Sequence, residues 1–448
     1  MTTKVADLAR QLLDAARKAG AEAADVVAIE SESTDVEVRN GALEAAGRTE
    51  ETELGLRVLI GNRQACVAAT GRDTDAFAAM AGRAVDMARV APDDPHVGLA
   101  DPSILGSGAD PASLDLVDPA EGLDPDALRD HALSAEAAAL AVPGISQSLS
   151  ASAGQNRTSS WYAATNGVDA GRDYTQSYIS AAVITGEGTA MERDYASEVR
   201  SHFSDLPEAA EIGHLAGERT IARAGARKPP TGAYPILYDE RVAAGLIGHL
   251  LQAVDGAAVA RGASWLRGAI GAEVLPAGID LIEDPHRTRI TASRTFDAEG
   301  LPTFVRKIVD DGRLAGFTLD LATARKLGLQ STASARRNPG SPPTPGLAGI
   351  TLTSGTATRD DLLSDMGTGL LVTSMIGSSI NPTTGDYSRG ASGFWVENGE
   401  ISYPVNECTL AGNLREMLRT IKPANDARRH ATRVVPSLLV EGLMLAGA

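Results

Sequence analysis

The sequence has very little cysteine and no closely spaced histidines, and both shortages limit the metal sites it could build. Its 448 residues include two cysteines, Cys66 and Cys408, which lie far apart and form no CxxC pair. A disulfide framework or a thiolate zinc site is therefore not indicated, and a reducing cytoplasm is the expected location. No histidine lies within eight residues of another, and the sequence contains no His-Glu dipeptide. A zinc site built from distant single ligands stays open, without a pattern to support it. The seven histidines are His96, His131, His202, His214, His249, His286 and His430.

Basic residues and long apolar runs are also scarce. Lys and Arg number 41 against 58 Asp and Glu, which gives a formal net charge of -17. This charge repels phosphate backbones, so direct nucleic-acid binding is not expected. No run approaches the roughly 18 to 20 apolar residues that cross a bilayer. The N-terminal segment places apolar residues at a helical period and lacks a signal-peptide core, so we expect an opening helix and no membrane association.

Turn signals divide the chain into an N-terminal α+β domain over residues 1–226 and a β-rich C-terminal domain over residues 235–448. Alternating runs separated by Asn40-Gly41 and Gly61-Asn62 predict antiparallel hairpins after the first helix. Residues 91–127 are rich in Pro, Asp and Gly and are predicted to be a long surface connection. Further helices are predicted at 73–90, 125–141 and 207–224, and strands of the same sheet at 156–165, 173–187 and 190–202.

The C-terminal domain follows the Pro-Pro-Thr-Gly boundary at 229–232 and is dominated by short strands and Gly-rich turns. Its Pro-rich loop at 336–346 is expected to be exposed. The segment 369–413 has strand-length runs at 369–376, 392–397 and 400–405, with an Asn-Gly hairpin turn between the last two. Its glycines allow sharp bends or close approach, which suits an extended peptide added along a sheet edge, or a partner subunit. A tightly turned β core is an equal alternative.

Three residues were considered as nucleophiles. Ser264 and Ser392 sit among small residues, but neither completes Gly-x-Ser-x-Gly, so a turn or packing role is favoured for both. Cys408 lies in an apolar, strand-like segment and is favoured as a small buried residue. An independent hydrolase that uses Ser392 or Cys408 is therefore the weakest of the functional hypotheses.

Two neighbouring pairs of carboxylates could in principle perform acid–base chemistry. Glu283 and Asp284 precede Pro285, and Asp297 and Glu299 precede Gly300. Such residues are typical of turns, which is the favoured interpretation. A nucleotide site is weakly indicated at most, because no Gly-rich phosphate loop is present.

Several ordered motifs resemble the TldD/PmbA metallopeptidase family. The most specific is GDYSRGASGFWVENGEISYPV at 385–405, followed by TLAGNL at 409–414. Upstream, the similarity continues through RGASWL at 261–266, FDAEG at 296–300 and the ARKLG and ARR segments that begin at 324 and 335. The resemblance covers the C-terminal half in motif order, and the N-terminal helix and strands are consistent with it.

The resemblance implies two kinds of chain. TldD-type chains carry a His-Glu-x-x-x-His helix and a later cysteine that hold a catalytic zinc, and they pair with PmbA (TldE) chains that lack these ligands. When the chain is aligned on the shared Arg-Gly-x-Ser motif, here at 261–264, the positions of the first histidine, the glutamate and the second histidine are occupied by Ile247, Gly248 and Gln252, respectively. His249 lies two residues past the first position, roughly 200° around the helix. The cysteine region at 425–436 also lacks a thiol.

The resemblance therefore implies a PmbA-type, non-catalytic subunit of a heteromeric zinc peptidase that cleaves unfolded or extended peptides. This chain would hold no cofactor, and zinc and base would come from a TldD-type partner. Family members are linked to peptide-antibiotic maturation, DNA gyrase modulation and antitoxin degradation. The alternative is a stand-alone peptide-binding or regulatory protein without protease activity. The candidate substrate or partner surface comprises Gly377, Gly385, Asp386, Ser388, Gly390 and Ser392.

Overall fold

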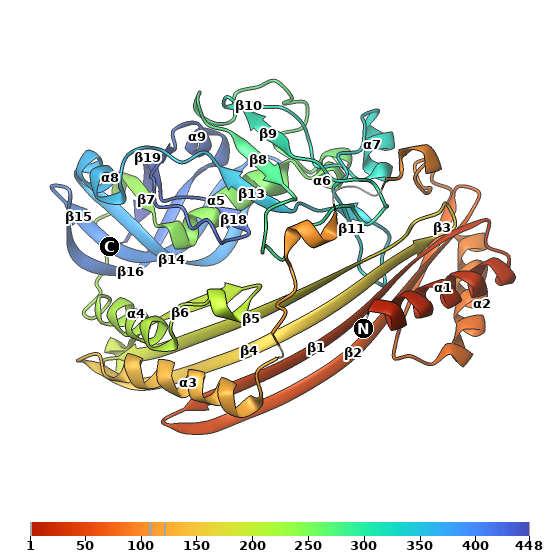
Figure 1. Cartoon of the computed structure of the whole chain (residues 1–448). Coiled ribbons are helices and arrows are strands. Elements are labelled where there is room, and N and C mark those ends of the chain that lie inside the picture. Colours follow the sequence, from red (N-terminus) through yellow and green to blue (C-terminus); the bar gives the residue numbers. More distant parts are fainter. Residues whose placement is uncertain (1, 107–109, 121, 448) are drawn as a thin grey trace.

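The computed structural model describes residues 2–106, 110–120 and 122–447, with only the backbone described for residues 2, 3 and 378. Residues 107–109 and 121 of the predicted surface connection lie outside the described residues, as do residues 1 and 448 at the outer ends of the two predicted domains. Within the described residues the fold is α+β, as the sequence predicts. Figure 1 shows long strands from the N-terminal half running beneath the C-terminal half.

The N-terminal half is built on one antiparallel six-stranded sheet in the order β3-β2-β1-β4-β5-β6. The predicted hairpin at Asn40 and Gly41 is confirmed, because both residues have positive φ, as a type I′ turn requires. The strands predicted from residue 156 onward do complete this sheet, but β4 begins eleven residues earlier than expected. The strands are β1 Ala23–Arg39, β2 Ala42–Ile60, β3 Arg63–Thr70, β4 Ile145–Ala164, β5 Asp169–Thr185 and β6 Glu192–Arg200.

Two helix pairs cover the two ends of one face of this sheet, which we call the outer face (Figure 1). Leu12 and Phe77, from the first pair, pack against Val26 and Leu56 of the strands. The second pair packs against Val36 and other apolar residues at the opposite end of the same face. The pairs are α1 Thr2–Ala19 with α2 Phe77–Val90, and α3 Pro125–Leu140 with α4 Ala209–Ile221; short 3-10 turns are η1 Thr74–Ala76, η2 Pro102–Ile104, η3 Pro111–Leu114, η4 Gly188–Ala190 and η5 Phe203–Asp205.

The core of the C-terminal half is a sheet that closes on itself. Its order is β16-β15-β14-β7-β19-β17, and an additional pairing of β16 with β19 completes a five-stranded barrel. The predicted Asn398-Gly399 turn joins β15 to β16, and both residues again have positive φ. The strands are β7 Gly232–Tyr238, β14 Gly369–Ile380, β15 Asp386–Glu397, β16 Glu400–Asn413, β17 Lys422–Pro423 and β19 Leu438–Ala446.

A smaller sheet in the order β10-β9-β8-β13-β18 and a two-stranded β11-β12 ladder lie beside the barrel. Their strands are β8 Leu281–Asp284, β9 Arg306–Asp310, β10 Arg313–Leu314, β11 Ala335–Arg336, β12 Thr344–Pro345, β13 Gly349–Leu352 and β18 Arg433–Val434. The helices of this half are α5 Glu240–Ala253, α6 Gly256–Ala260, α7 Leu321–Leu327, α8 Arg359–Met366 and α9 Leu414–Arg419.

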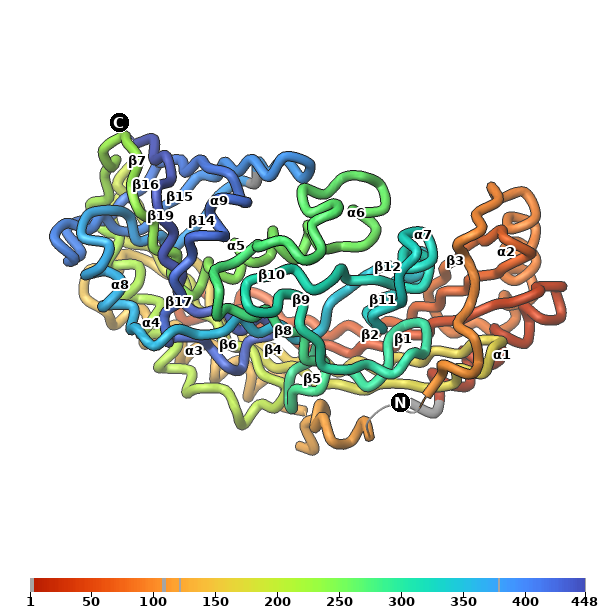
Figure 2. The backbone as a smooth tube through the Cα atoms, turned by 90° about the horizontal axis from the view of Figure 1, so that it is seen from above, coloured from red at the N-terminus to blue at the C-terminus, as the bar shows by residue number. Residues whose placement is uncertain are grey.

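The C-terminal half lies over the other face of the N-terminal sheet, the inner face, as the view from above shows (Figure 2). As predicted, part of the loop 336–346 is exposed, at Arg336, Asn338, Gly340 and Thr344. The Arg337 side chain departs from the prediction, because it is 1% exposed and pairs with Asp25 of β1. Arg57 of β2 donates to the same carboxylate at 2.6 Å. A Cβ on Gly55 would lie 2.3 Å from the Pro339 carbonyl oxygen, so the loop rests directly on the sheet. Proline and glycine content predicted a loop correctly, but it did not show that one side of the loop packs against the N-terminal sheet.

None of the helices in the described part of the chain is both long and apolar enough to cross a bilayer.

Candidate functional site

Helix α5 carries the positions that the family resemblance assigns to a zinc site. Asp239 caps its N-terminus by accepting a hydrogen bond from the Arg241 amide at 3.2 Å. Most of its residues are buried, including Ala243, Leu246, Leu250 and Leu251. A helix that is apolar around most of its circumference belongs inside a domain, and α5 packs within the main apolar cluster of the C-terminal half.

The three helix positions do not converge on one point. Ile247 is fully buried in the apolar cluster, whereas Gln252 is exposed to solvent. A Cβ on Gly248 would lie 3.1 Å from Nη1 of Arg433, so that guanidinium packs against the bare helix backbone. Ile and Gly side chains offer no donor atom, and zinc requires nitrogen, sulfur or carboxylate ligands. These residues therefore do not fit a zinc ion.

His249 lies on the buried side of α5, next to the barrel strand β15. Its ring contacts Tyr387 edge to face, with 5.8 Å between the ring centroids. Burial, and secondarily the charge of Arg389, lowers its pKa from the ordinary value. The side chain of Gln252, one turn further along α5, has a smaller, opposite effect on this pKa. His249 is therefore a buried histidine that packs beside β15.

The glycine-rich candidate surface begins where β14 meets β15. Gly377 has φ 70° and its carbonyl accepts a hydrogen bond from Nε of Arg389 at 2.7 Å. Gly385 has φ 85°, and a Cβ there would lie 3.5 Å from the Trp265 ring. Both glycines are therefore favoured by backbone conformation, because positive φ strains residues that carry a Cβ.

Asp386 organises the turn between these strands. Its carboxylate accepts hydrogen bonds from the Thr384 hydroxyl at 2.6 Å and from Nδ2 of Asn413 at 3.0 Å. The Thr384 hydrogen bond, followed by that from Asn413, lowers the pKa of this exposed carboxylate. An ionised carboxylate fixed by two neighbours is a stable feature of the surface at neutral pH.

Ser388, Gly390 and Ser392 lie along β15, which pairs with β14 on one side and β16 on the other. Because both edges are occupied, a peptide cannot add to β15 as a new strand. Ser392 is 5% exposed, and its hydroxyl accepts a hydrogen bond from Nη2 of Arg223, beyond the end of α4, at 3.1 Å. It therefore joins the two halves of the molecule. The role of this surface toward a substrate or partner stays a prediction.

The other two nucleophile candidates are structural, as the sequence favoured. The Ser264 hydroxyl donates to the Ala253 carbonyl at 2.5 Å and accepts from the Leu266 amide at 3.0 Å, which fixes the turn after α6. The Cys408 thiol donates to the Ala391 carbonyl at 3.1 Å, and burial raises its pKa to about 11. At neutral pH this thiol is protonated and a poor nucleophile.

The two carboxylate pairs include Glu283 and Asp297, which accept hydrogen bonds from other groups of the protein. Glu283 and Asp284 end strand β8, so the turn interpretation was wrong for them. Glu283 is buried and accepts a hydrogen bond from Nε of Arg306 at 2.8 Å. Asp297 and Glu299 do lie in a turn, and burial raises the pKa of both carboxyl groups. Asp297 accepts hydrogen bonds from the backbone amides of Glu299, Leu301 and Ala335.

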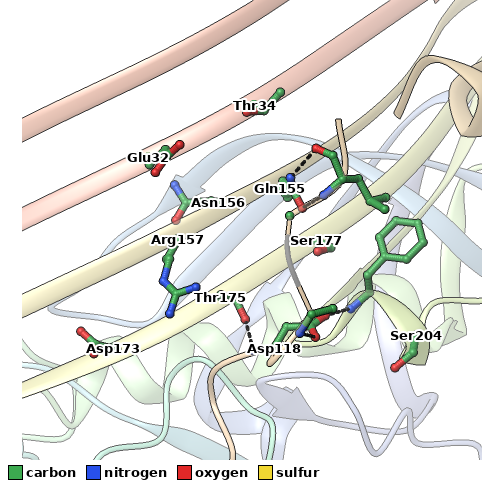
Figure 3. Close-up of a pocket in the computed structure, with 14 residues that line it drawn as sticks. Glu32, Thr34, Asp118, Gln155, Asn156, Arg157, Asp173, Thr175, Ser177 and Ser204 are labelled. Atoms are coloured by element: carbon green, nitrogen blue, oxygen red, sulfur yellow. Dashed lines mark hydrogen bonds between the residues drawn. The ribbon is translucent and has the colours of Figure 1, made fainter. Parts of the chain in front are cut away.

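Sequence reasoning missed a cavity of about 590 Å³ on the outer face of the N-terminal sheet (Figure 3). Its floor is the middle of β1, β4 and β5, and Arg157 and Ser177 are among the side chains that line it. Polar residues at alternate positions in otherwise half-buried strands were the available signal. Within the described residues, no group of three or more His, Cys, Asp or Glu side chains is arranged to hold a metal ion.

Comparison with known families matches three consecutive domain models. Residues 24–88 match PmbA/TldA metallopeptidase domain 1, residues 118–224 the central domain and residues 231–447 the C-terminal domain. The metalloprotease PmbA of Escherichia coli O157:H7 is 35% identical over 95% of this chain and 92% of that protein. The chain belongs to the PmbA/TldD metallopeptidase family. A PmbA homologue of Haemophilus influenzae is 33% identical over 97% of this chain and 94% of that protein.

Other family members match at greater distance. A TldD homologue, also from H. influenzae, is 27% identical over 36% of this chain and 34% of that protein. A crystal structure from Bacteroides thetaiotaomicron, described as a candidate modulator of DNA gyrase, has a TM-score of 0.91 at 27% identity and covers 99% of this chain and 98% of that one. TldE from Thermococcus kodakarensis shares the fold, with a TM-score of 0.85 at 19% identity over 98% of this chain and all of that one.

Proposed function

We propose that this protein is the non-catalytic subunit of a heteromeric peptidase that cleaves unfolded or extended peptides. The observation that carries the proposal is helix α5, where Ile247 is buried in the core and Gly248 has no side chain. An isoleucine and a glycine at these two positions supply neither a metal ligand nor a general base. The catalytic zinc and base would come from a TldD-type partner chain.

The family relatives support a two-chain assembly. H. influenzae has both a PmbA homologue and a TldD homologue that are similar to this chain, the former along nearly its full length. The glycine-rich surface on β14 and β15 is the proposed contact for partner or substrate. Ile376, beside Gly377, is 71% exposed and is the apolar side chain of this surface that we expect a partner to cover. A cytoplasmic location belongs to the same proposal, supported by the two free thiols.

The test uses the full chain alone and co-expressed with the TldD-type protein of the same organism. Alone, the chain should contain no stoichiometric zinc by mass spectrometry of metals and should not cleave reduced, unfolded casein. The co-purified pair should contain zinc and cleave casein in a chelator-sensitive manner. Zinc and chelator-sensitive cleavage by the single chain would overturn the proposal. A chain that binds casein but captures no partner would favour the stand-alone binding protein.

A matched pair of variants tests the proposed surface. Ile376→Glu should weaken co-purification or casein cleavage, because a charge enters an apolar contact. Met87→Glu, on the outer side of α2 and 45% exposed, makes the same kind of change far from that surface and should have no effect. Equal behaviour of the two variants would place the contact elsewhere.

A further inference from the structure

The cavity on the outer face lies between the two helix pairs. On this face the side chains of β1, β4 and β5 are apolar beneath the helices, as at Val26 and Val36, and polar in the middle. Glu32, Arg157 and Thr175 are directly opposite one another across the three strands. Thr34, Gln155 and Ser177 form the next row. Helices leave this polar middle uncovered, and the cavity of about 590 Å³ is within the range of small-molecule sites.

Hydrogen bonds join the segments that form the wall of the cavity to the strands that form its floor. Gln155 accepts a hydrogen bond from the Leu123 amide at 3.1 Å and donates to the Leu123 carbonyl at 2.8 Å. Asp118 accepts from the Phe203 amide at 2.8 Å, and its own amide donates to the Thr175 hydroxyl at 2.7 Å. The side chains of Gln155 and Asp118 already have hydrogen-bond partners in the protein, so their role is to fix the shape of the cavity. Leu123 and Phe203 give the wall an apolar side.

Two polar groups that line the cavity have no such partners. Ser177 is 4% exposed, yet its hydroxyl makes no hydrogen bond within the described residues. Arg157 likewise forms no ion pair or hydrogen bond among them, and Figure 3 shows it reaching over β5 between Asp173 and Thr175. The Ser177 hydroxyl lines the open cavity and can donate to or accept from a ligand there, and a guanidinium presents a planar fork that matches a carboxylate. Both groups are therefore available to a ligand.

The charges around Arg157 limit what this ligand can be. Glu32, Asp118 and Asp173 also line the cavity, so a multiply charged anion such as a nucleotide would be repelled. A single carboxylate can pair with Arg157, and an accompanying ammonium or amide N–H can meet carboxylate and hydroxyl acceptors. We propose that this cavity binds the α-carboxylate end of an amino acid unit with an apolar side chain, either a free amino acid or the C-terminal residue of a short peptide. This proposal does not depend on the non-catalytic role proposed above.

Calorimetric titration of the full chain tests the proposal with four probes: leucine, the tripeptide Ala-Ala-Leu, the same tripeptide as its C-terminal amide, and inorganic phosphate. Leucine or Ala-Ala-Leu should bind, and which of them binds more tightly separates the two sources of the carboxylate. The amide should bind at least about 10-fold more weakly, because it cannot pair with the guanidinium. Equal binding of acid and amide, tighter binding of phosphate, or no binding of either acid would overturn the proposal.

Variants connect the binding to the named residues. Arg157→Ala should weaken binding by about 10-fold or more, and Ser177→Ala by about 3-fold without lowering the melting temperature. Arg83→Ala removes an exposed arginine of α2 that has no partner among the described residues, and it should leave the affinity unchanged. Unchanged affinity in Arg157→Ala would contradict the assignment even if the acids bind.

Discussion

The two faces of the N-terminal sheet are built from the same strands but treat polar side chains in opposite ways. On the inner face Asp25, Arg57 and Arg337 are buried together between the two halves of the chain. On the outer face Arg157 is exposed in an open cavity and forms no ion pair with any residue that the structure describes. Charged side chains of these strands are therefore buried where the C-terminal half packs on them, because strand alternation directs successive residues to opposite faces of the sheet.

The largest effect is expected when the inner face loses its central carboxylate. Asp25→Ala removes the carboxylate that pairs with two buried guanidinium groups, so it should lower the free energy of unfolding by about 3–5 kcal/mol. Denaturant titration measures this loss. Asp14→Ala, which removes an exposed carboxylate from α1, should change stability by less than about 0.5 kcal/mol. Similar losses in both variants would show that the inner face is no more sensitive than the surface.

The helix pairs on the outer face allow the next comparison. A Cβ on Gly213 of α4 would lie 1.9 Å from the Ala135 carbonyl oxygen of α3, so Gly213→Ala should destabilise the fold by about 1–3 kcal/mol. A Cβ on Gly82 of α2 would meet nothing within 4 Å, so Gly82→Ala should stabilise it by about 0.5–1 kcal/mol. Thermal unfolding of both variants measures whether the melting temperature falls for Gly213→Ala and rises for Gly82→Ala. Equal changes in melting temperature would mean that α3 and α4 move apart at little cost.

Glu240, at the start of α5, lies outside both faces of the N-terminal sheet and shows what burial of a single carboxylate costs. Burial, with the charge of Asp239, raises the pKa of Glu240 to about 7. A raised carboxyl pKa contributes stability that is fully present below the unfolded value near 4.5 and is lost as the pH rises through about 7. Glu240→Gln should therefore be more stable than the natural chain at pH 8 by about 1 kcal/mol, allowing for solvent screening, and no more stable at pH 4.

The smallest effect is expected at the cavity floor. Ser177→Ala removes a hydroxyl that makes no hydrogen bond within the described residues, so its free energy of unfolding should stay within about 0.5 kcal/mol of the natural chain. Thr175→Val, which removes a hydroxyl that donates to the Ser201 carbonyl at 2.8 Å, should cost about 1–2 kcal/mol. A loss in Ser177→Ala as large as that in Thr175→Val would show that Ser177 has a structural partner.

Local sequence patterns predicted the elements better than their surroundings. Asn40-Gly41 and Asn398-Gly399 gave correct hairpins, because a two-residue turn with positive φ is determined by those residues themselves. The Pro-rich loop at 336–346 was expected to be exposed, but Arg337 is buried against β1. For the glycine-rich strands the sequence left two equal alternatives, a sheet edge for a peptide or partner and a tightly turned β core, and the pairing of β16 with β19 that closes the barrel agrees with the second. Both outcomes depend on contacts between segments far apart in sequence.

The residues of the candidate site could also be predicted from the sequence, whereas their surroundings could not. Motifs and helix register singled out Ile247, Gly248 and Gln252, and side-chain chemistry alone shows that two of them cannot bind a metal. That Ile247 faces the core while Gln252 faces solvent required the packing of α5 inside the C-terminal half. The outer-face cavity was not foreseen, because Arg157 and Ser177 belong to different strands and no motif connects them.

The helices of the N-terminal half, the Asn-Gly hairpin turns and the family could be predicted from the sequence, because each depends on residues close together in the chain or on motifs in fixed order. Which polar groups have partners and which face an open cavity depends on the tertiary structure. Ser392 was found to join the two halves through Arg223, whereas Ser177 and Arg157 line an open cavity. The physical reason is that a polar side chain is satisfied or left unpaired by its neighbours in space, and these come from strands and loops far away in the sequence.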